Sequence, residues 1–184
     1  MHDIDISNLK SKILIASPQI PANSIFFQSV LYIYRQTQEA TIGVIINRPI
    51  QISAKDFLVS IGLDNRLGQH NHQLEILIGG PNEKESGFIL YQDKDTLDIS
   101  VSSSLNMFQD IVVGKGPDRA QVFLGYCVWE SDGLLDEINH NYWLISTLKS
   151  DILFDVEYSQ RWEKSLEKLG ISPQEITSGY NGNC

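Results

Sequence analysis

The sequence contains a series of short apolar runs that are too short for helices of ordinary length. They are rich in the β-branched and aromatic residues that favour strands, and Gly, Pro or polar residues bound each of them. These runs lie at residues 12–16, 29–34, 41–46, 74–78, 87–91, 97–101, 123–129 and 143–148. The pattern predicts a sheet of many short strands. The polar connection between the second and third runs predicts an antiparallel hairpin.

Apolar residues at helical spacing predict helices between several of these strands. One helix is expected over residues 53–61, with Ser53 as its cap, and another over 102–113, with Leu105, Phe108, Ile111 and Val112 facing inward. Ser131 and Asp132 can cap a short acidic helix that follows. A last helix is expected over 158–169, with one apolar face that consists of Tyr158, Trp162, Leu166 and Leu169. Arg161, Lys164 and Lys168 alternate with glutamates on its solvated face. The segment DILFDV before this helix is assigned no element.

Length and composition predict one globular domain over residues 1–184, with loosely held termini at about 1–10 and 173–184. The 42% hydrophobic and 20% charged content is that of an ordinary soluble protein. The first residues lack the basic start and apolar run of a secretory signal, and no stretch is apolar enough to span a membrane. We therefore expect a cytoplasmic protein.

The charge balance argues against nucleic-acid binding. A net charge of −9 and scattered basic residues disfavour the clustered Lys and Arg that phosphate backbones require. We expect an unknown protein or small molecule as partner, no membrane contact, and a monomer or weak dimer. No cofactor and no metal site is expected. The loop pair His70 and His72 lacks a third ligand at a diagnostic spacing, and Cys127 is expected to be a small buried hydrophobe, with Cys184 in the loose C-terminus.

The stretch from Leu124 to Leu144 is the best candidate for a site. Gly125 interrupts its strand and predicts a bulge or a close backbone approach. One interpretation places Glu130, Asp132 and Glu137 on the rim of a pocket floored by Trp129. The other is that these carboxylates favour the dipole of the following helix and face water. The sequence leaves both open.

Two further positions are displayed at strand ends. Pro49 ends the ladder of the third run and predicts that Asn47 and Arg48 are exposed there, where they could bind an anion or cap their own loop. The segment Gly79-Gly80-Pro81 permits backbone angles or close contacts that a side chain would block. It is not a phosphate loop, because the required Gly-Lys-Ser/Thr ending is missing.

A catalytic set is not visible in the sequence. No G-x-S-x-G elbow is present, and the histidines lie in a tail, a loop or a helix end. We assign no catalytic residue. The alternative is an enzyme of unknown reaction that uses Glu130, Asp132 and Glu137 beside Trp129.

Three motifs together resemble the YqgE/AlgH family, also called UPF0301 or DUF179. They are GVIINRP at residues 43–49, GGPNEKESGFILY at 79–91 and LGYCVWESDGLLDEI at 124–138, and the match covers nearly the whole chain in the expected order. The resemblance implies an α+β protein with a largely antiparallel, barrel-like sheet flanked by helices. It brings no established enzymatic activity, and some members have been described as transcriptional regulators.

The resemblance also suggests which residues to consider for binding. The family's recurrent polar and aromatic features fall on Asn47, Arg48, Gly79, Gly80, Pro81, Gly87, Gly125, Tyr126, Trp129 and Glu137. Together with Glu130, most of these form our predicted binding set. The chain departs from the family pattern at Tyr34, Arg35, Tyr91 and Val128. The residue types expected at the first three of these positions include a cysteine and a histidine, so no chemistry is assigned there.

Overall fold

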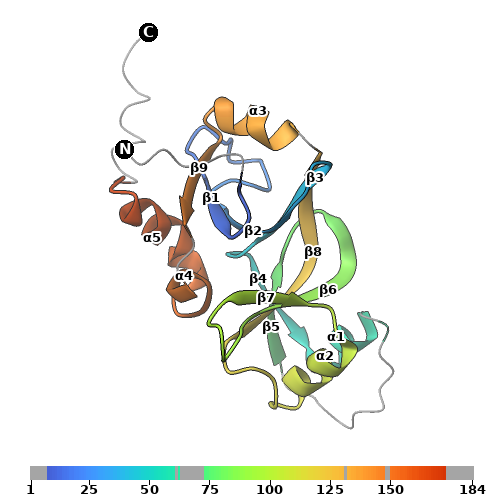
Figure 1. Ribbon diagram of the computed structural model, residues 1–184. Helices are drawn as coiled ribbons and strands as arrows, with labels where there is room; N and C mark the ends of the chain where they lie inside the picture. The colour runs from blue at the N-terminus through green and yellow to red at the C-terminus, as the bar shows by residue number, and fades with distance from the viewer. Residues whose placement is uncertain (1–7, 61, 63–72, 131, 148–149, 173–184) are drawn as a thin grey trace. The chain divides into compact units, whose positions relative to one another are not determined.

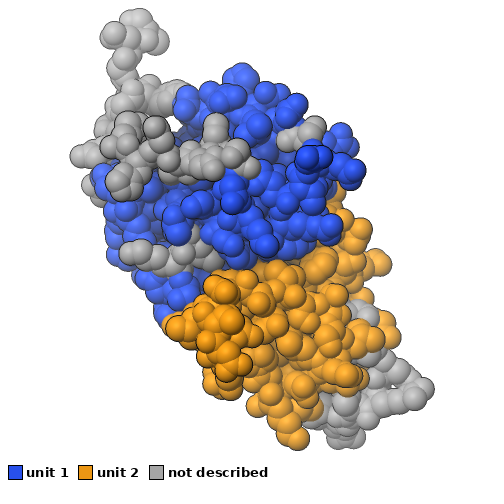
Figure 2. All heavy atoms as spheres, viewed as in Figure 1, with its two compact units in different colours: residues 1–47, 128–184 blue, residues 48–127 orange. Residues whose placement is uncertain are grey.

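The computed structural model describes residues 8–60, 62, 73–130, 132–147 and 150–172. The chain forms two compact units, coloured separately in Figure 2. Unit 1 combines residues 1–47 with residues 128–184, and unit 2 comprises residues 48–127. The chain therefore leaves unit 1, builds unit 2 and returns. The single domain expected over residues 1–184 stays a prediction.

Unit 1 contains an antiparallel sheet in the order β3-β2-β1-β9. Its strands are β1 (Lys12–Ala16), β2 (Val30–Gln36), β3 (Ala40–Ile45) and β9 (Trp143–Thr147). The predicted hairpin is confirmed as the β2–β3 pair. The helical elements of this unit are α3 (Gly133–Asn139), α4 (Ser150–Phe154), the 3-10 turn η1 (Tyr158–Gln160) and α5 (Arg161–Lys168). Figure 1 shows them at the orange and red end of the chain.

Helix α5 buries the face that the sequence predicted, with one correction. Trp162 and Leu166 are buried, and the indole N–H of Trp162 donates to the carbonyl of Ala16 at 2.8 Å. Arg161, however, does not lie on a solvated face, because it is only 2% exposed. Its guanidinium stacks over the ring of Tyr158, 4.2 Å from the centroid, and donates to the carbonyls of Val156 and Ile46. Burial of this cation is tolerated because its donors find acceptors.

Unit 2 contains a mixed, open sheet in the order β4-β5-β8-β6-β7. Its strands are β4 (Pro49–Ser53), β5 (Gln73–Ile78), β6 (Asn82–Gln92), β7 (Ile99–Ser102) and β8 (Ala120–Glu130), whose last three residues belong to unit 1. Strands β5 and β8 run parallel, and the other neighbours are antiparallel. The chain is thus a mixed α and β protein, as predicted. Barrel-like closure is not confirmed.

Two helices, α1 (Ala54–Ser60) and α2 (Leu105–Val112), cover one face of the unit 2 sheet. The buried core between them consists of Phe57, Leu58, Ile76, Ile89, Phe108, Val112 and Val122. Phe57 and Phe108 meet edge to face with centroids 5.6 Å apart. The predicted cap of the first helix is confirmed, since the hydroxyl of Ser53 accepts the backbone N–H of Asp56 at 3.0 Å.

Several sequence predictions are corrected in unit 2. Pro49 begins a strand instead of ending one, which is allowed because the first residue of an edge strand can lack its donor. Helix α2 begins at Leu105 and not at Ser102, because Ser102 is the last residue of β7. Leu105 was predicted to face inward and is 50% exposed. One correction concerns unit 1. Helix α4, which was not predicted, overlaps the segment DILFDV.

The backbones of two glycine segments cross at very short range in unit 2. A Cβ atom on Gly80 would lie 2.2 Å from the carbonyl carbon of Tyr126 and 2.3 Å from its oxygen. Gly125 has a φ of +70°, and a Cβ there would lie 2.6 Å from the carbonyl oxygen of Gly80. The register between β6 and β8 shifts beside this crossing, between Asn82 and Gly87. The predicted close approach is therefore confirmed at both glycines.

We predict that Gly80→Ala destabilises the protein by about 3 kcal/mol, because the added methyl group overlaps backbone atoms that cannot move independently. Urea unfolding followed by circular dichroism measures this change. Gly133→Ala is the matched control, since nothing lies within 4 Å of a Cβ at this first residue of α3. There we expect no loss, or a gain below about 1 kcal/mol. Equal stability of the two variants would contradict the close crossing.

Candidate functional site

Asn47, predicted to be displayed at a strand end, is instead a buried connector of unit 1. Its Oδ1 accepts the backbone N–H of Val30 at 3.0 Å, and its Nδ2 donates to the carbonyl of Gln28 at 2.9 Å. The side chain thereby substitutes for a strand partner next to the start of β2. Asn47 therefore binds a segment 17–19 residues earlier in the chain, which is neither display at a strand end nor capping of its own loop. The following residue, Arg48, is partly buried, and desolvation lowers the pKa of its guanidinium.

Trp129 and Glu137 come together in an aromatic cluster of unit 1. Trp129 is 8% exposed and Trp143 is 3% exposed, and both rings pack against Phe26 and each other with centroids 5.4–6.3 Å apart. Oε2 of Glu137 accepts the indole N–H of Trp143 at 2.6 Å and that of Trp129 at 3.2 Å. The carboxylate therefore satisfies two donors that would otherwise be buried without partners.

The other two carboxylates predicted beside Trp129 have different surroundings. Glu130 is exposed at the end of β8. Asp132 is exposed at the N-cap of α3, but its side chain makes no capping hydrogen bond. The other predicted cap, Ser131, lies outside the described residues. Of the three carboxylates, the structure ties only Glu137 to Trp129.

In unit 2, the remaining predicted residues surround the glycine crossing. Gly79 and Gly80 are buried, and Pro81 is exposed beside them. The hydroxyl of Tyr126 donates to Oε1 of Glu83 at 2.9 Å, and its ring meets Phe88 edge to face. The hydrogen bond to this carboxylate raises the pKa of Tyr126. Cys127 is 1% exposed, as predicted, and its thiol lies 3.5 Å from the carbonyl of Gly79.

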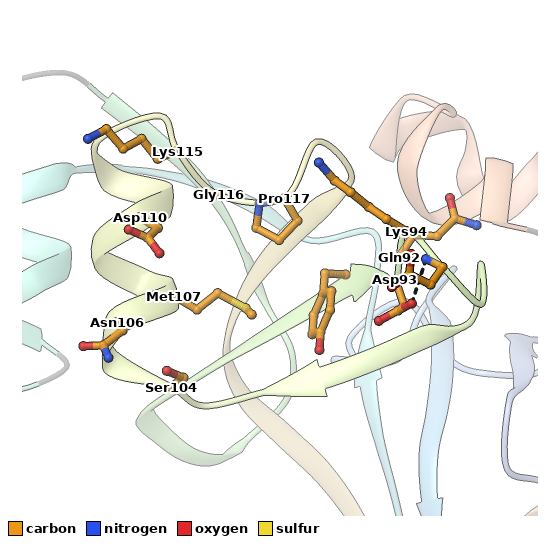
Figure 3. Close-up of a pocket in the computed structure, with 12 residues that line it drawn as sticks. Gln92, Asp93, Lys94, Ser104, Asn106, Met107, Asp110, Lys115, Gly116 and Pro117 are labelled. Atoms are coloured by element: carbon orange, nitrogen blue, oxygen red, sulfur yellow. Dashed lines mark hydrogen bonds between the residues drawn. The ribbon is translucent and has the colours of Figure 1, made fainter.

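A hollow of about 510 Å³ opens on unit 2, away from every residue of the predicted set. We call it the α2 hollow; Figure 3 shows it between α2, the β6–β7 turn and the loop before β8. It is lined by Tyr91, Gln92, Asp93, Lys94, Asp95, Ser104, Asn106, Met107, Asp110, Lys115, Gly116 and Pro117. In Figure 3 Met107 points from α2 across the hollow, while Lys94 leans from the turn towards Pro117.

The turn on one side of the α2 hollow is held by its own side chains. Oδ1 of Asp93 accepts the backbone N–H groups of Thr96 at 3.0 Å and Asp95 at 2.9 Å. These two bonds, that of Thr96 first, lower the pKa of the Asp93 carboxyl. Nζ of Lys94 lies 3.4 Å from a carboxylate oxygen of Asp118, with both side chains exposed. The Asp93 carboxylate therefore holds the backbone of the turn, and charged side chains lie on its rim.

The α2 side of the hollow carries polar side chains that have no partner among the described residues. The side chains of Ser104, Asn106, Asp110 and Lys115 make no hydrogen bond or ion pair within the described part of the chain, and neither does that of Asp95 on the turn. They supply hydroxyl, amide, carboxylate and ammonium groups around a floor that includes Met107. This mixture can bind a small polar ligand by hydrogen bonds and by charges of both signs.

Sequence reasoning missed the α2 hollow because its lining comes from a turn, a helix face and a loop that only the fold brings together. The one usable signal was the acidic turn after residue 92, which by its sequence is only a connection between two strands. Within the described residues, no group of three or more His, Cys, Asp or Glu is arranged to hold a metal ion. His70, His72 and Cys184 lie outside those residues.

A model of the AlgH-like family, DUF179, matches residues 13–174 of the chain. The chain belongs to the AlgH-like family. This member is 34% identical to a UPF0301 protein of Aliivibrio salmonicida over 182 residues, which cover 93% of this chain and 97% of that protein. It is 32% identical to a UPF0301 protein of Rickettsia canadensis over 187 residues, with 97% of each covered. The resemblance stated from the motifs is thus confirmed.

Solved structures agree with the assignment to the AlgH-like family. The fold is similar to the solution structure of AlgH from Pseudomonas aeruginosa, with a TM-score of 0.74, 27% identity and 100% of both chains covered. It is also similar to the crystal structure of DIP2367 from Corynebacterium diphtheriae, with a TM-score of 0.68 over 92% of this chain and 90% of that one. At 15% identity the second likeness shows the fold alone.

The names of these relatives state a family and no reaction. They therefore assign no activity to this chain. Among the helices that the structure describes, none combines the length and apolar character needed to cross a bilayer.

We predict that Glu137→Ala destabilises the protein by about 2–4 kcal/mol, because it leaves two buried indole donors without an acceptor. Asp136→Ala is the matched control on the same helix, and it should cost less than about 1 kcal/mol since that residue is exposed. Urea unfolding monitored by tryptophan fluorescence measures both variants. If Glu137→Ala kept full stability but lost binding of a ligand, the pocket interpretation of this stretch would replace the structural one.

We also predict that the β6–β7 turn responds to acid. The folded-state pKa of Asp93 is lowered from 3.8, so its stabilising bonds are present above the unfolded pKa and are lost as pH falls through the folded pKa. A carboxyl carbon NMR titration should give a midpoint for Asp93 below 3.8. The amide shifts of Thr96 and Asp95 should follow the same curve. Amides that do not follow it would contradict the turn geometry.

Proposed function

We propose that this AlgH-like protein is a non-enzymatic binding module that takes a small zwitterionic molecule, such as an amino acid, into the α2 hollow. The observation that carries the proposal is the set of hydrogen-bonding side chains around the hollow that have no partner among the described residues. Carboxylates of Asp95 and Asp110 suit an ammonium group, and the ammonium of Lys115 suits a carboxylate. Met107 and Tyr91 offer apolar contact between them.

We further propose that the protein has a regulatory role in the cytoplasm. It acts as a monomer or weak dimer, through a partner and not by direct contact with DNA. The net charge of −9 supports this part of the proposal. The basic residues of α5 support it too. Arg161 is buried, Lys164 pairs with Glu167 at 2.7 Å and Lys168 pairs with Asp151 at 2.7 Å. A helix with its cations engaged in this way offers no row of charges for phosphates.

The binding residues predicted from the sequence have two roles in this proposal. Arg48, Pro81, Tyr126 and Glu130 are at least partly exposed and are proposed as contacts for a protein partner. Asn47, Gly79, Gly80, Trp129 and Glu137 are largely used by the fold itself. The enzyme alternative needs Glu137 as one of its carboxylates. That role competes with the two indole donors it already accepts.

The test is a titration of the isotope-labelled full-length protein with single amino acids, followed by amide NMR spectra. We expect saturable shifts confined to residues 91–95, 104–110 and 115–117. Asn106→Trp places a large side chain in the hollow at an exposed position and should weaken binding at least tenfold. Lys55→Trp is the control, because Lys55 is exposed on α1 and does not line the hollow.

Two results would overturn the proposal. One is the absence of shifts at millimolar concentrations of every amino acid. The other is binding that Asn106→Trp leaves unchanged, which would place the ligand elsewhere. The same samples, kept for a day, distinguish binding from catalysis. An unchanged ligand spectrum supports a binding module, whereas conversion of the ligand would make the protein an enzyme.

A further inference from the structure

Strand β7 has an open edge. Among the described strands it pairs only with β6. The hydrogen bond from the backbone N–H of Asp93 to the carbonyl of Asp98, at 2.9 Å, shows which residues face β6. Antiparallel ladders alternate, so Asp98, Ser100 and Ser102 direct their backbone groups towards β6. Ile99 and Val101 therefore direct their N–H and C=O groups outward.

The outward backbone groups of β7 have no partner among the residues that the structure describes. No hydrogen bond to Ile99 or Val101 is present outside the ladder in the part of the chain that the structure describes. Four backbone groups, two donors and two acceptors, are therefore available at the spacing of one strand. This is the arrangement that an added β-strand satisfies.

Apolar side chains surround this edge without being used by the core. Leu97 before the strand is 67% exposed, Val101 within it is 37% exposed, and Leu105 after it is 50% exposed. Leu105 is the residue whose helical position predicted burial. Proteins normally protect an open edge with charged residues or proline, and β7 has neither in its sequence Ile-Ser-Val-Ser. An unprotected edge flanked by exposed apolar groups indicates an interaction surface.

Acidic residues near the β7 edge favour a partner with basic residues. The turn that leads into β7 carries Asp93, Asp95 and Asp98, while the nearby Lys94 lies beside Asp118. The whole chain has a net charge of −9, which disfavours pairing between two copies. A basic segment of another protein is complementary in sign. In an antiparallel arrangement the C-terminal end of the incoming strand lies beside the acidic turn.

We propose that the β7 edge binds an extended segment of a partner protein as an additional antiparallel strand, with alternating apolar residues followed by Lys or Arg at its C-terminal end. The backbone groups of Ile99 and Val101 supply the hydrogen bonds. Leu97, Val101 and Leu105 supply apolar contact, and the acidic turn supplies specificity for the basic end. The β7 edge shares Asp93 and Asp95 with the lining of the α2 hollow, but its backbone hydrogen bonds need no ligand in the hollow.

The experiment titrates the full-length protein with a synthetic peptide of alternating Thr and Val that ends in Lys-Arg-Lys. Amide NMR spectra and hydrogen exchange report the contact. We expect saturable shifts and slowed exchange at the amides of Ile99 and Val101, and binding that weakens as salt is added. A peptide that ends in Glu-Asp-Glu should bind at least tenfold more weakly.

Val101→Pro is the decisive variant, because it removes an outward donor without removing a bond to β6. It should abolish peptide binding. Val101→Thr keeps the donor and loses only exposed apolar contact, so the dissociation constant for the peptide should change by no more than about threefold. If Val101→Pro failed to fold, the pair Asp95→Lys and Asp98→Lys would test the charge part, with an expected loss of at least tenfold.

Three outcomes would overturn the proposal. They are no shift at Ile99 and Val101 at millimolar peptide, equal binding of the basic and acidic peptides, or a concentration-dependent dimer through β7 that excludes the peptide. Asn106→Trp, which blocks the α2 hollow, should leave peptide binding intact. A failure of amino acid binding is therefore distinguishable from a failure of strand addition.

Discussion

The backbone crossing between Gly80 and Tyr126 is the constraint on which unit 2 depends. Because no side chain fits at Gly80, and Gly125 needs a φ of +70°, the segments after β5 and within β8 can lie against each other only as glycines. The crossing accompanies the register shift of β6 against β8. Strand β6 then continues into the turn and β7. This turn borders the α2 hollow, and β7 carries the open edge.

Unit 1 shows why polar residues in recognisable motifs are weak guides to a site. Asn47, Glu137 and Arg161 are the kinds of residue that often bind ligands. Here Asn47 replaces a strand partner, Glu137 accepts two indole donors, and Arg161 donates to backbone carbonyls. Each meets the requirement that a buried polar group be hydrogen-bonded. These motif positions therefore hold the fold together, whereas the α2 hollow and the β7 edge, apart from Tyr91, are built from residues outside the family motifs.

Much of the fold could be predicted from local patterns. Strand β1, the β2–β3 hairpin and the core face of α5 follow from periodicity, and the close approach at Gly80 and Gly125 follows from the conformational freedom of glycine. The misses share a physical cause. Arg161 is buried because a tyrosine ring and two carbonyls from other segments receive it, and no pattern within the helix encodes those partners. Leu105 is exposed because β7 continues through Ser102 and displaces the start of the helix.

The sequence by itself determined the short strands, the acidic character and membership of the AlgH-like family, because each depends on residues close together in the chain or on composition. It marked the glycines of the crossing, but only the tertiary structure decided which backbone segments meet there. The tertiary structure alone decided which polar groups are occupied. It brought the β6–β7 turn, α2 and the loop before β8 around one hollow. It also left the outer groups of Ile99 and Val101 without partners among the described residues. Hydrogen-bond satisfaction is a property of distant segments in contact, so one-dimensional patterns do not contain it.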